Sequence, residues 1–103
     1  MKQFDNVSVV VRGNSYYNGA VTSRRINFPD GSYKTLGFML PGEYEFSTEA
    51  AELMEITMGE LDVKLPGSNE WIKVKSGDSF NAPGNSSFLV KVIDVTDYCC
   101  SYL

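Results

Sequence analysis

The chain has 103 residues and a mass of 11.4 kDa, a length that fits one domain over residues 1–103 with one hydrophobic core. Its net charge of −4 provides no positive field for nucleic acid or anionic membranes, and no apolar run approaches the roughly 20 residues of a membrane-spanning helix. The N-terminus is too polar for an export signal, so we expect a cytoplasmic protein. Cys99 and Cys100 are adjacent, which would strain a mutual disulfide, and we expect two free thiols.

Short runs of β-branched and aromatic residues alternate with Gly, Pro, Asn and Asp along the chain, which predicts an all-β protein. Residues 49–52 are too few for a helix, and we expect a turn there. Strands without intervening helices indicate a sandwich, a jelly roll or a barrel. The predicted strands are 7–12, 20–28, 32–40, 43–48, 53–65, 70–75, 79–82, 87–95 and 98–102.

Side-chain alternation predicts which face of each strand meets the core. Charged residues at 60, 62 and 64 alternate with Leu61 and Val63, so one face of this segment meets solvent. Lys34 lies in phase with the apolar residues at 36, 38 and 40, and we expect it on their core-facing side. Arg24 and Arg25 project to opposite faces of their strand, so at most one of them can join Lys34.

Two spacings resemble the sequence motifs of the cupin family. Six residues separate Glu52 from Gly59, as at the end of the first motif, and five separate Gly77 from Pro83, as at the start of the second. The resemblance implies a single-domain cupin-type β-barrel, that is, a jelly roll.

The positions that hold metal ligands in cupins carry no histidine in this chain. By the same spacings they fall on Phe46, Thr48 and Phe88, and the sequence contains no histidine at all. The resemblance therefore implies a barrel interior lined by two phenyl rings and one hydroxyl group.

Five segments also resemble, in order, a family of about a hundred residues, the pyrimidine/purine nucleoside phosphorylases. This resemblance implies phosphorolysis of nucleosides to free base and ribose 1-phosphate, which is a pentosyl transfer. It implies nucleosides and inorganic phosphate as ligands, with phosphate as co-substrate and no metal or organic cofactor. The matching segments are 37–39, 41–48, 52–59, 77–84 and 98–103.

The resemblance and the strand pattern together suggest roles for eight residues. Glu52 is the catalytic candidate, since a carboxylate inside a barrel needs hydrogen-bond donors such as ribose hydroxyls. Lys34 is the candidate for binding phosphate. The candidates for binding the base and sugar are Tyr44, Phe46, Thr48, Phe80, Asn81 and Phe88.

Each of these residues also has a purely structural interpretation: solvated charge for Lys34 and Glu52, core packing for the aromatic residues, and a turn contact for Asn81. Under that interpretation the protein is a non-catalytic small-ligand-binding cupin. A further alternative is a hard metal ion bound by Glu45, Glu52 and Asp78. Edge-to-edge pairing of strands predicts a homodimer.

Overall fold

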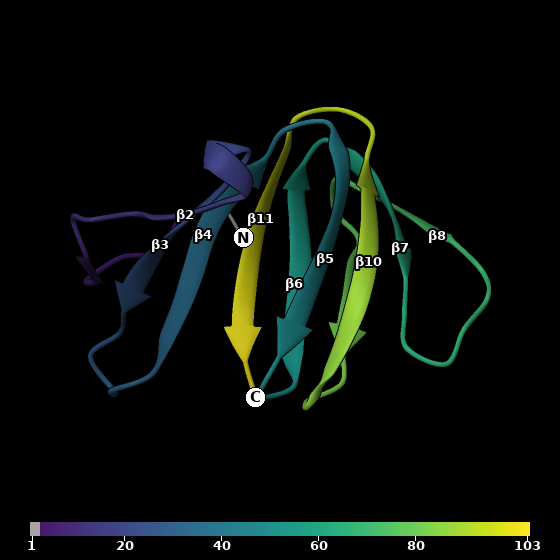
Figure 1. Ribbon diagram of the computed structural model, residues 1–103. Coiled ribbons are helices and arrows are strands. Elements are labelled where there is room, and N and C mark those ends of the chain that lie inside the picture. Colours follow the sequence, from purple (N-terminus) through teal and green to yellow (C-terminus); the bar gives the residue numbers. More distant parts are fainter. Residues whose placement is uncertain (1–2) are drawn as a thin grey trace.

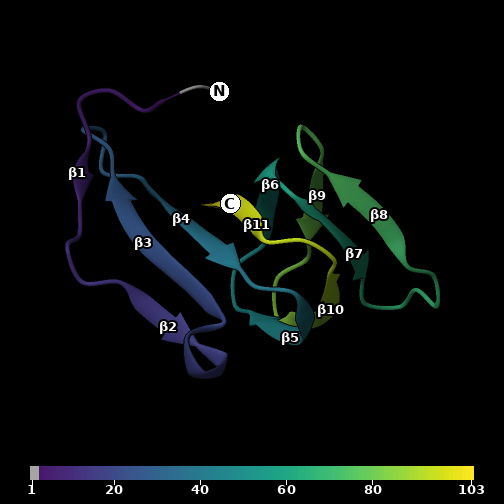
Figure 2. The same cartoon turned by 90° about the horizontal axis from the view of Figure 1, so that it is seen from above.

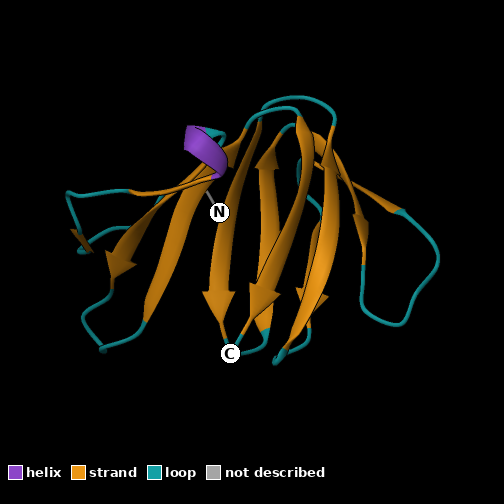
Figure 3. Ribbon diagram, viewed as in Figure 1, coloured by secondary structure: helices purple, strands orange, loops and turns teal. Residues whose placement is uncertain are grey.

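The computed structural model describes residues 3–103, and nearly all of its regular structure is β-strand (Figures 1 and 3). One short 3-10 turn, η1 (Tyr17–Gly19), interrupts the strands. No helix within residues 3–103 has the length and apolarity to cross a bilayer. The expectation of an all-β chain is confirmed.

Two antiparallel sheets face each other. In the larger sheet the strand order is β1-β3-β4-β11-β6-β9, and β2 also pairs with β3. Its strands are β1 (Ser8–Val9), β2 (Asn14–Tyr16), β3 (Val21–Asn27), β4 (Tyr33–Met39), β6 (Glu52–Met58), β9 (Ser79–Ala82) and β11 (Thr96–Tyr102).

The smaller sheet has the order β5-β10-β7-β8. Seen from above, β1 to β4 extend beyond the region where the two sheets overlap and form a wing on one side of the barrel (Figure 2). The strands of the smaller sheet are β5 (Gly42–Thr48), β7 (Glu60–Lys64), β8 (Ile72–Lys75) and β10 (Ser86–Val92).

The predicted hairpin of 20–28 with 32–40 is present as β3 and β4. Its turn is closed by the Gly31 amide, which donates to the Phe28 carbonyl at 3.1 Å, and Gly31 has a φ of +89° that favours glycine. The Asp30 carboxylate accepts a 2.9 Å hydrogen bond from the Ser32 amide. Turn chemistry near 29–31 therefore sets the register of the wing.

The core lies between the sheets where they overlap. Leu61 and Val63 are fully buried, and the charged residues at 60, 62 and 64 lie on the outer face, as the alternation predicted. Val90 and Phe88 on β10 and Met54 on β6 belong to the same buried cluster. One apolar core thus joins both sheets.

The N-terminal strands differ from the prediction. In place of one strand over 7–12, β1 and β2 pair separately with the two halves of β3, and residues 10–13 lie between them. Asn14 and Ser15, which lie outside the predicted strands, are strand residues, because they pair with the edge of β3. The turn predicted at 49–52 ends one residue early, since Glu52 already pairs with Tyr102.

Gly37 lies where two backbones approach closely. A Cβ atom at this position would be 1.8 Å from the Thr22 carbonyl oxygen on β3. Tyr98 on β11 is the register partner of Gly37, and its hydroxyl reaches across β4 to donate to the same carbonyl at 3.1 Å. A glycine in the middle of the sheet thus lets a tyrosine from the next strand cross it.

We predict that Gly37→Ala lowers the stability of the fold by about 1–3 kcal/mol, because backbone must move to admit the methyl group. Gly13→Ala is the control, since its Cβ would meet its nearest neighbour, Arg24 Cζ, at 3.4 Å, which the flexible arginine can accommodate. Denaturant unfolding of the three proteins measures the difference. Equal midpoints for both variants would contradict the prediction.

Candidate functional site

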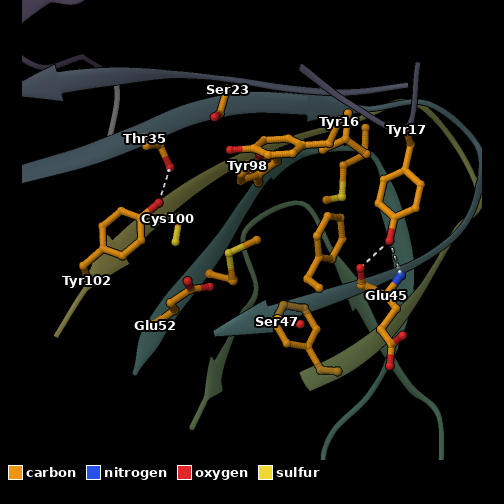
Figure 4. Close-up of a pocket in the computed structure, with 15 residues that line it drawn as sticks. Tyr16, Tyr17, Ser23, Thr35, Glu45, Ser47, Glu52, Tyr98, Cys100 and Tyr102 are labelled. Carbon is orange, nitrogen blue, oxygen red and sulfur yellow. Dashed lines mark hydrogen bonds between the residues drawn. The ribbon is translucent and has the colours of Figure 1, made fainter. Parts of the chain in front are cut away.

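A cavity of about 490 Å³ opens between the inner face of the larger sheet and strands β5 and β10 of the smaller sheet (Figure 4). It is therefore continuous with the barrel interior at the base of the wing. Its lining residues are Tyr16, Tyr17, Val21, Ser23, Thr35, Met39, Glu45, Phe46, Ser47, Glu52, Met54, Phe88, Tyr98, Cys100 and Tyr102.

Aromatic rings form one wall of this cavity. Phe46 and Phe88 are register partners on β5 and β10, and their ring centroids are 5.7 Å apart. Tyr17 packs edge-on against Phe46 at 6.1 Å and lies 5.0 Å from Tyr44. Rings at these separations make a continuous apolar surface.

Tyr17 also fastens the two sheets together beside the cavity. Its hydroxyl donates to the carbonyl oxygen of Glu45 and accepts a hydrogen bond from the Glu45 amide at 3.2 Å (Figure 4). β5 is an edge strand of its sheet, so this side chain satisfies a peptide group that pairs with no neighbouring strand. Tyr17 and Asn18 both have positive φ, 54° and 56°, which turns the chain toward β5.

Polar groups line the opposite wall. The Glu52 side chain is half-buried, and this burial raises its pKa above the ordinary range, an effect partly offset by a hydrogen bond from the Cys100 thiol. Burial also raises the pKa of Cys100 to about 12, so this thiol stays protonated at neutral pH. The Tyr102 hydroxyl lies 3.2 Å from the Thr35 hydroxyl. Glu52 is thus the one charged side chain in a group of neutral donors.

Tyr98 forms the floor between the two walls. Its hydroxyl donates to the Thr22 carbonyl, and burial raises the pKa of this hydroxyl well above the usual range. The residue is 8% exposed and its hydroxyl is neutral at physiological pH, so Tyr98 contributes shape and no charge.

Three predicted site residues are brought together by the structure. Glu52, Phe46 and Phe88 all line the cavity, and they come from three different strands, β6, β5 and β10. The two phenyl rings that were expected at the cupin ligand positions are thus present in the cavity lining.

The expected orientation of Lys34 is wrong. The inner face of β4 carries Thr35 and Met39, both buried, so Lys34 projects from the outer face. Its ammonium nitrogen lies 5.5 Å and 5.8 Å from the ring centres of Phe4 and Phe28. The apolar residues at 36, 38 and 40 also belong to this outer face, so the assumption that they face the core put Lys34 on the wrong side.

Four other candidates lie outside the cavity lining. The Thr48 hydroxyl is buried and donates to the Pro83 carbonyl at 2.6 Å, and the Tyr44 hydroxyl donates to the Leu40 carbonyl at 2.7 Å. Phe80 is buried behind Phe88, with centroids 5.7 Å apart. Asn81 is on the exposed face of β9. These residues support the wall from behind or face away from it.

Sequence reasoning missed the tyrosines at 16, 17, 98 and 102 together with Ser23, Thr35 and Cys100 as lining residues. A period-two signal existed for the last strand, because Tyr98, Cys100 and Tyr102 share one face. No comparable signal marked Tyr16 and Tyr17, whose placement depends on the unusual turn at η1.

The carboxylates proposed as a metal site do not converge. Asp78 lies in the β8–β9 turn and accepts a hydrogen bond from the Lys75 amide at 3.1 Å, whereas Glu45 is exposed on β5. Over residues 3–103 no group of three His, Cys, Asp or Glu side chains is placed to hold a metal ion. The residues present therefore do not fit the donor set of a cupin metal centre.

Solved structures establish the relationship of the fold. A protein of unknown function from Acinetobacter sp. ADP1 superposes with a TM-score of 0.95 at 41% identity, covering 98% of each chain. An RmlC-like cupin from Shewanella frigidimarina superposes with a TM-score of 0.72 at 16% identity, covering 99% of this chain and 93% of that one. The second likeness concerns the fold alone, and it confirms the predicted cupin-type barrel.

Sequence relatives carry a consistent name. A protein from Sulfurovum sp. (strain NBC37-1), named pyrimidine/purine nucleoside phosphorylase, is 75% identical over all of both chains. One of the same name from Geobacter sulfurreducens is 56% identical over 100% of this chain and 99% of its own. The family model described as pyrimidine/purine nucleoside phosphorylase matches residues 11–102, and the chain belongs to this family.

Proposed function

We propose that the protein is an enzyme that cleaves purine and pyrimidine nucleosides with phosphate, releasing the free base and ribose 1-phosphate. The observation that supports this most directly is the cavity, which joins an aromatic wall to a half-buried carboxylate within about 490 Å³. That volume lies in the range of pockets that bind small molecules. The family name of its relatives suggests the same substrates.

The aromatic wall suits the base of a nucleoside. Stacking on Phe46 and Phe88 uses the flat face that every base has, so it does not depend on the hydrogen-bonding pattern of the base edge. Such a wall accepts purines and pyrimidines alike. We therefore place the base against β5 and β10 and the ribose toward Glu52.

Glu52 has the properties required near the ribose. In phosphorolysis a phosphate oxygen forms a bond to the anomeric carbon, the bond from that carbon to the base nitrogen breaks, and the base leaves with the electron pair and takes up a proton. Positive charge develops on the sugar ring during this step. A carboxylate that accepts hydrogen bonds from ribose hydroxyls both positions the sugar and stabilises that charge.

The reaction as proposed needs phosphate as its co-substrate and no metal or organic cofactor. The attacking group is supplied by phosphate itself, so the protein needs no nucleophile of its own. The absence of histidine from the sequence is compatible with this chemistry. Our proposal also places the protein in the cytoplasm, where both substrates are available.

We predict phosphate-dependent release of free base from a panel of nucleosides, with a chelator leaving the rate unchanged. Glu52→Gln should lower kcat/KM by about 100-fold or more, because the amide cannot stabilise developing positive charge. Chromatographic detection of the base measures both. The variant should unfold at the same or a higher temperature than the parent, because it removes a half-buried charge.

The Glu52 carboxylate should also determine how kcat/KM falls at acid pH. Since burial raises the pKa of Glu52, its active ionised form is lost as pH falls through that raised value, so kcat/KM should decline at higher pH than for an ordinary glutamate. This decline should be missing from the residual activity of Glu52→Gln. A folded parent that releases no base above a control without enzyme would identify the chain as a binding protein instead.

We predict that Phe46→Ala raises KM for purine and pyrimidine nucleosides alike by about tenfold, because one stacking surface is lost. The control is Leu89→Ala on the outer face of β10, where the side chain is 37% exposed and points away from the cavity. Initial rates with one nucleoside of each class measure the change. An effect confined to one class would show that Phe46 does not act as a common stacking surface.

We further propose a homodimer. Its support is the edge strand β9 and the exposed apolar residues Val9, Leu36 and Phe38 on the outer face of the wing. Light scattering should report twice the 11.4 kDa chain mass. If the wing is the contact, Phe38→Glu should give the single chain; a dimer that survives assigns the contact to a sheet edge, and a monomeric parent contradicts the proposal.

A further inference from the structure

The proposed function requires a cation to bind phosphate, and within residues 3–103 no lysine or arginine lines the cavity. The charged side chains of its lining are the carboxylates Glu45 and Glu52. An anion with up to two negative charges beside these groups needs an opposing positive charge. A cationic side chain outside the lining, but on the same face of the sheet, must therefore reach the cavity mouth.

Most strand cations of the described chain are turned away from the cavity. Lys34 and Arg24 project from the outer face of the larger sheet, where Arg24 Nε donates to the Val11 carbonyl at 3.3 Å. The lysines of the smaller sheet lie on its outer face, where carboxylates or a tryptophan ring engage three of them. Those three are Lys73, Lys75 and Lys91.

Arg25 is the exception among the strand lysines and arginines of residues 3–103. It is two positions from Ser23 and is the register partner of Thr35, and both of these residues line the cavity. Side chains with this spacing share one face of a sheet, so Arg25 projects from the inner face of the wing. Arg24, its neighbour, projects from the other face, as the alternation predicted.

A row of side chains in contact connects Arg25 to the cavity. Its guanidinium carbon lies 3.7 Å from the centre of the Tyr33 ring, and the Tyr33 and Tyr102 ring centroids are 5.0 Å apart. Tyr102 lines the cavity. The Arg25 Nε donates to Asn27 Oδ1 at 2.8 Å, which further fixes the plane of the guanidinium group.

The donors that remain on Arg25 are available for a ligand. Within residues 3–103 its terminal amino groups have no hydrogen-bond acceptor, and no carboxylate lies within ion-pair distance. The residue is exposed, so an anion can approach it from solvent. A guanidinium group held over an aromatic ring presents a pair of donors that matches two phosphate oxygens.

We propose that Arg25 binds the phosphate co-substrate at the mouth of the cavity, with Tyr33 and Asn27 as positioning residues. The inference rests on the proposed function. β4 and β11 separate Arg25 from Glu52, so the two charges do not neutralise each other. Phosphate enters beside Tyr102, binds between Arg25 and Glu52, and there meets the sugar that Glu52 holds.

The test compares Arg25→Ala and Arg25→Lys with Arg24→Ala, which removes the same charge from the opposite face. At saturating nucleoside, Arg25→Ala should raise KM for phosphate by about tenfold or more, while KM for nucleoside changes less than about twofold. Arg25→Lys should give an intermediate phosphate KM, because it keeps the charge and loses the planar fork. Arg24→Ala should behave like the parent.

Calorimetric titration with inorganic phosphate, with and without a saturating nucleoside analogue that cannot be cleaved, gives a readout independent of turnover. Binding should weaken in Arg25→Ala and persist in Arg24→Ala. An active parent whose phosphate KM and phosphate binding are unchanged by Arg25→Ala would overturn the role of Arg25 and leave the proposed function standing. A parent protein without turnover would refute the proposed function, and the titration alone would then decide whether Arg25 binds an anion. If that parent also failed to bind phosphate, the proposed role of Arg25 would be overturned too.

Discussion

The two-residue period of strands β3 and β4 determines the chemistry of the cavity. Because side chains alternate between faces, the register that buries Met39 and Thr35 also turns Lys34 outward and Arg25 inward. A shift of this register by one residue would turn the inward side chains outward and the outward side chains inward. The inward position of Arg25, the polar wall and the apolar outer face all depend on this single register, which the turn at 29–31 helps to set.

Closure of the cavity depends on a second, more local contact. The larger sheet curves away from the smaller one at the wing, and Tyr17 spans the gap with its two hydrogen bonds to the Glu45 peptide group (Figure 4). The same ring packs on Tyr44 and Phe46, so one side chain both joins the sheets and extends the aromatic wall. A substitution of Tyr17 would therefore affect both the contact between the sheets and the aromatic wall of the cavity.

Much of the fold could be predicted from the sequence because its signals are local. Alternation at 60–64 correctly separated the buried Leu61 and Val63 from their charged neighbours, and turn residues placed most strand ends within a few positions. The spacing of Glu52 and Gly59 located the one carboxylate that lines the polar wall. These inferences needed no knowledge of which strands pair.

The side chains around the cavity were harder to predict, because a strand beside an open cavity reverses the usual pattern. Its inner face can carry Thr35 and Gly37, since the open cavity and a crossing tyrosine take the space that apolar residues would otherwise fill. Its outer face carries Leu36 and Phe38, so hydrophobicity alone selects the wrong side. Tyr17 was hidden for a different reason: its role depends on a positive φ at a non-glycine residue.

The distribution of charge follows from the same geometry. A carboxylate inside a barrel is costly unless donors surround it, and Glu52 has the Cys100 thiol beside it, with raised pKa values on both groups reflecting their burial. Placing a cation directly against Glu52 would stabilise the pair but would also occupy the groups that a substrate needs. With β4 and β11 between them, Arg25 and Glu52 both keep unused hydrogen-bonding capacity. In the mechanism that we propose, this separation leaves a site that is complete only when phosphate and the sugar are bound together, which favours reaction between the two over binding of either alone.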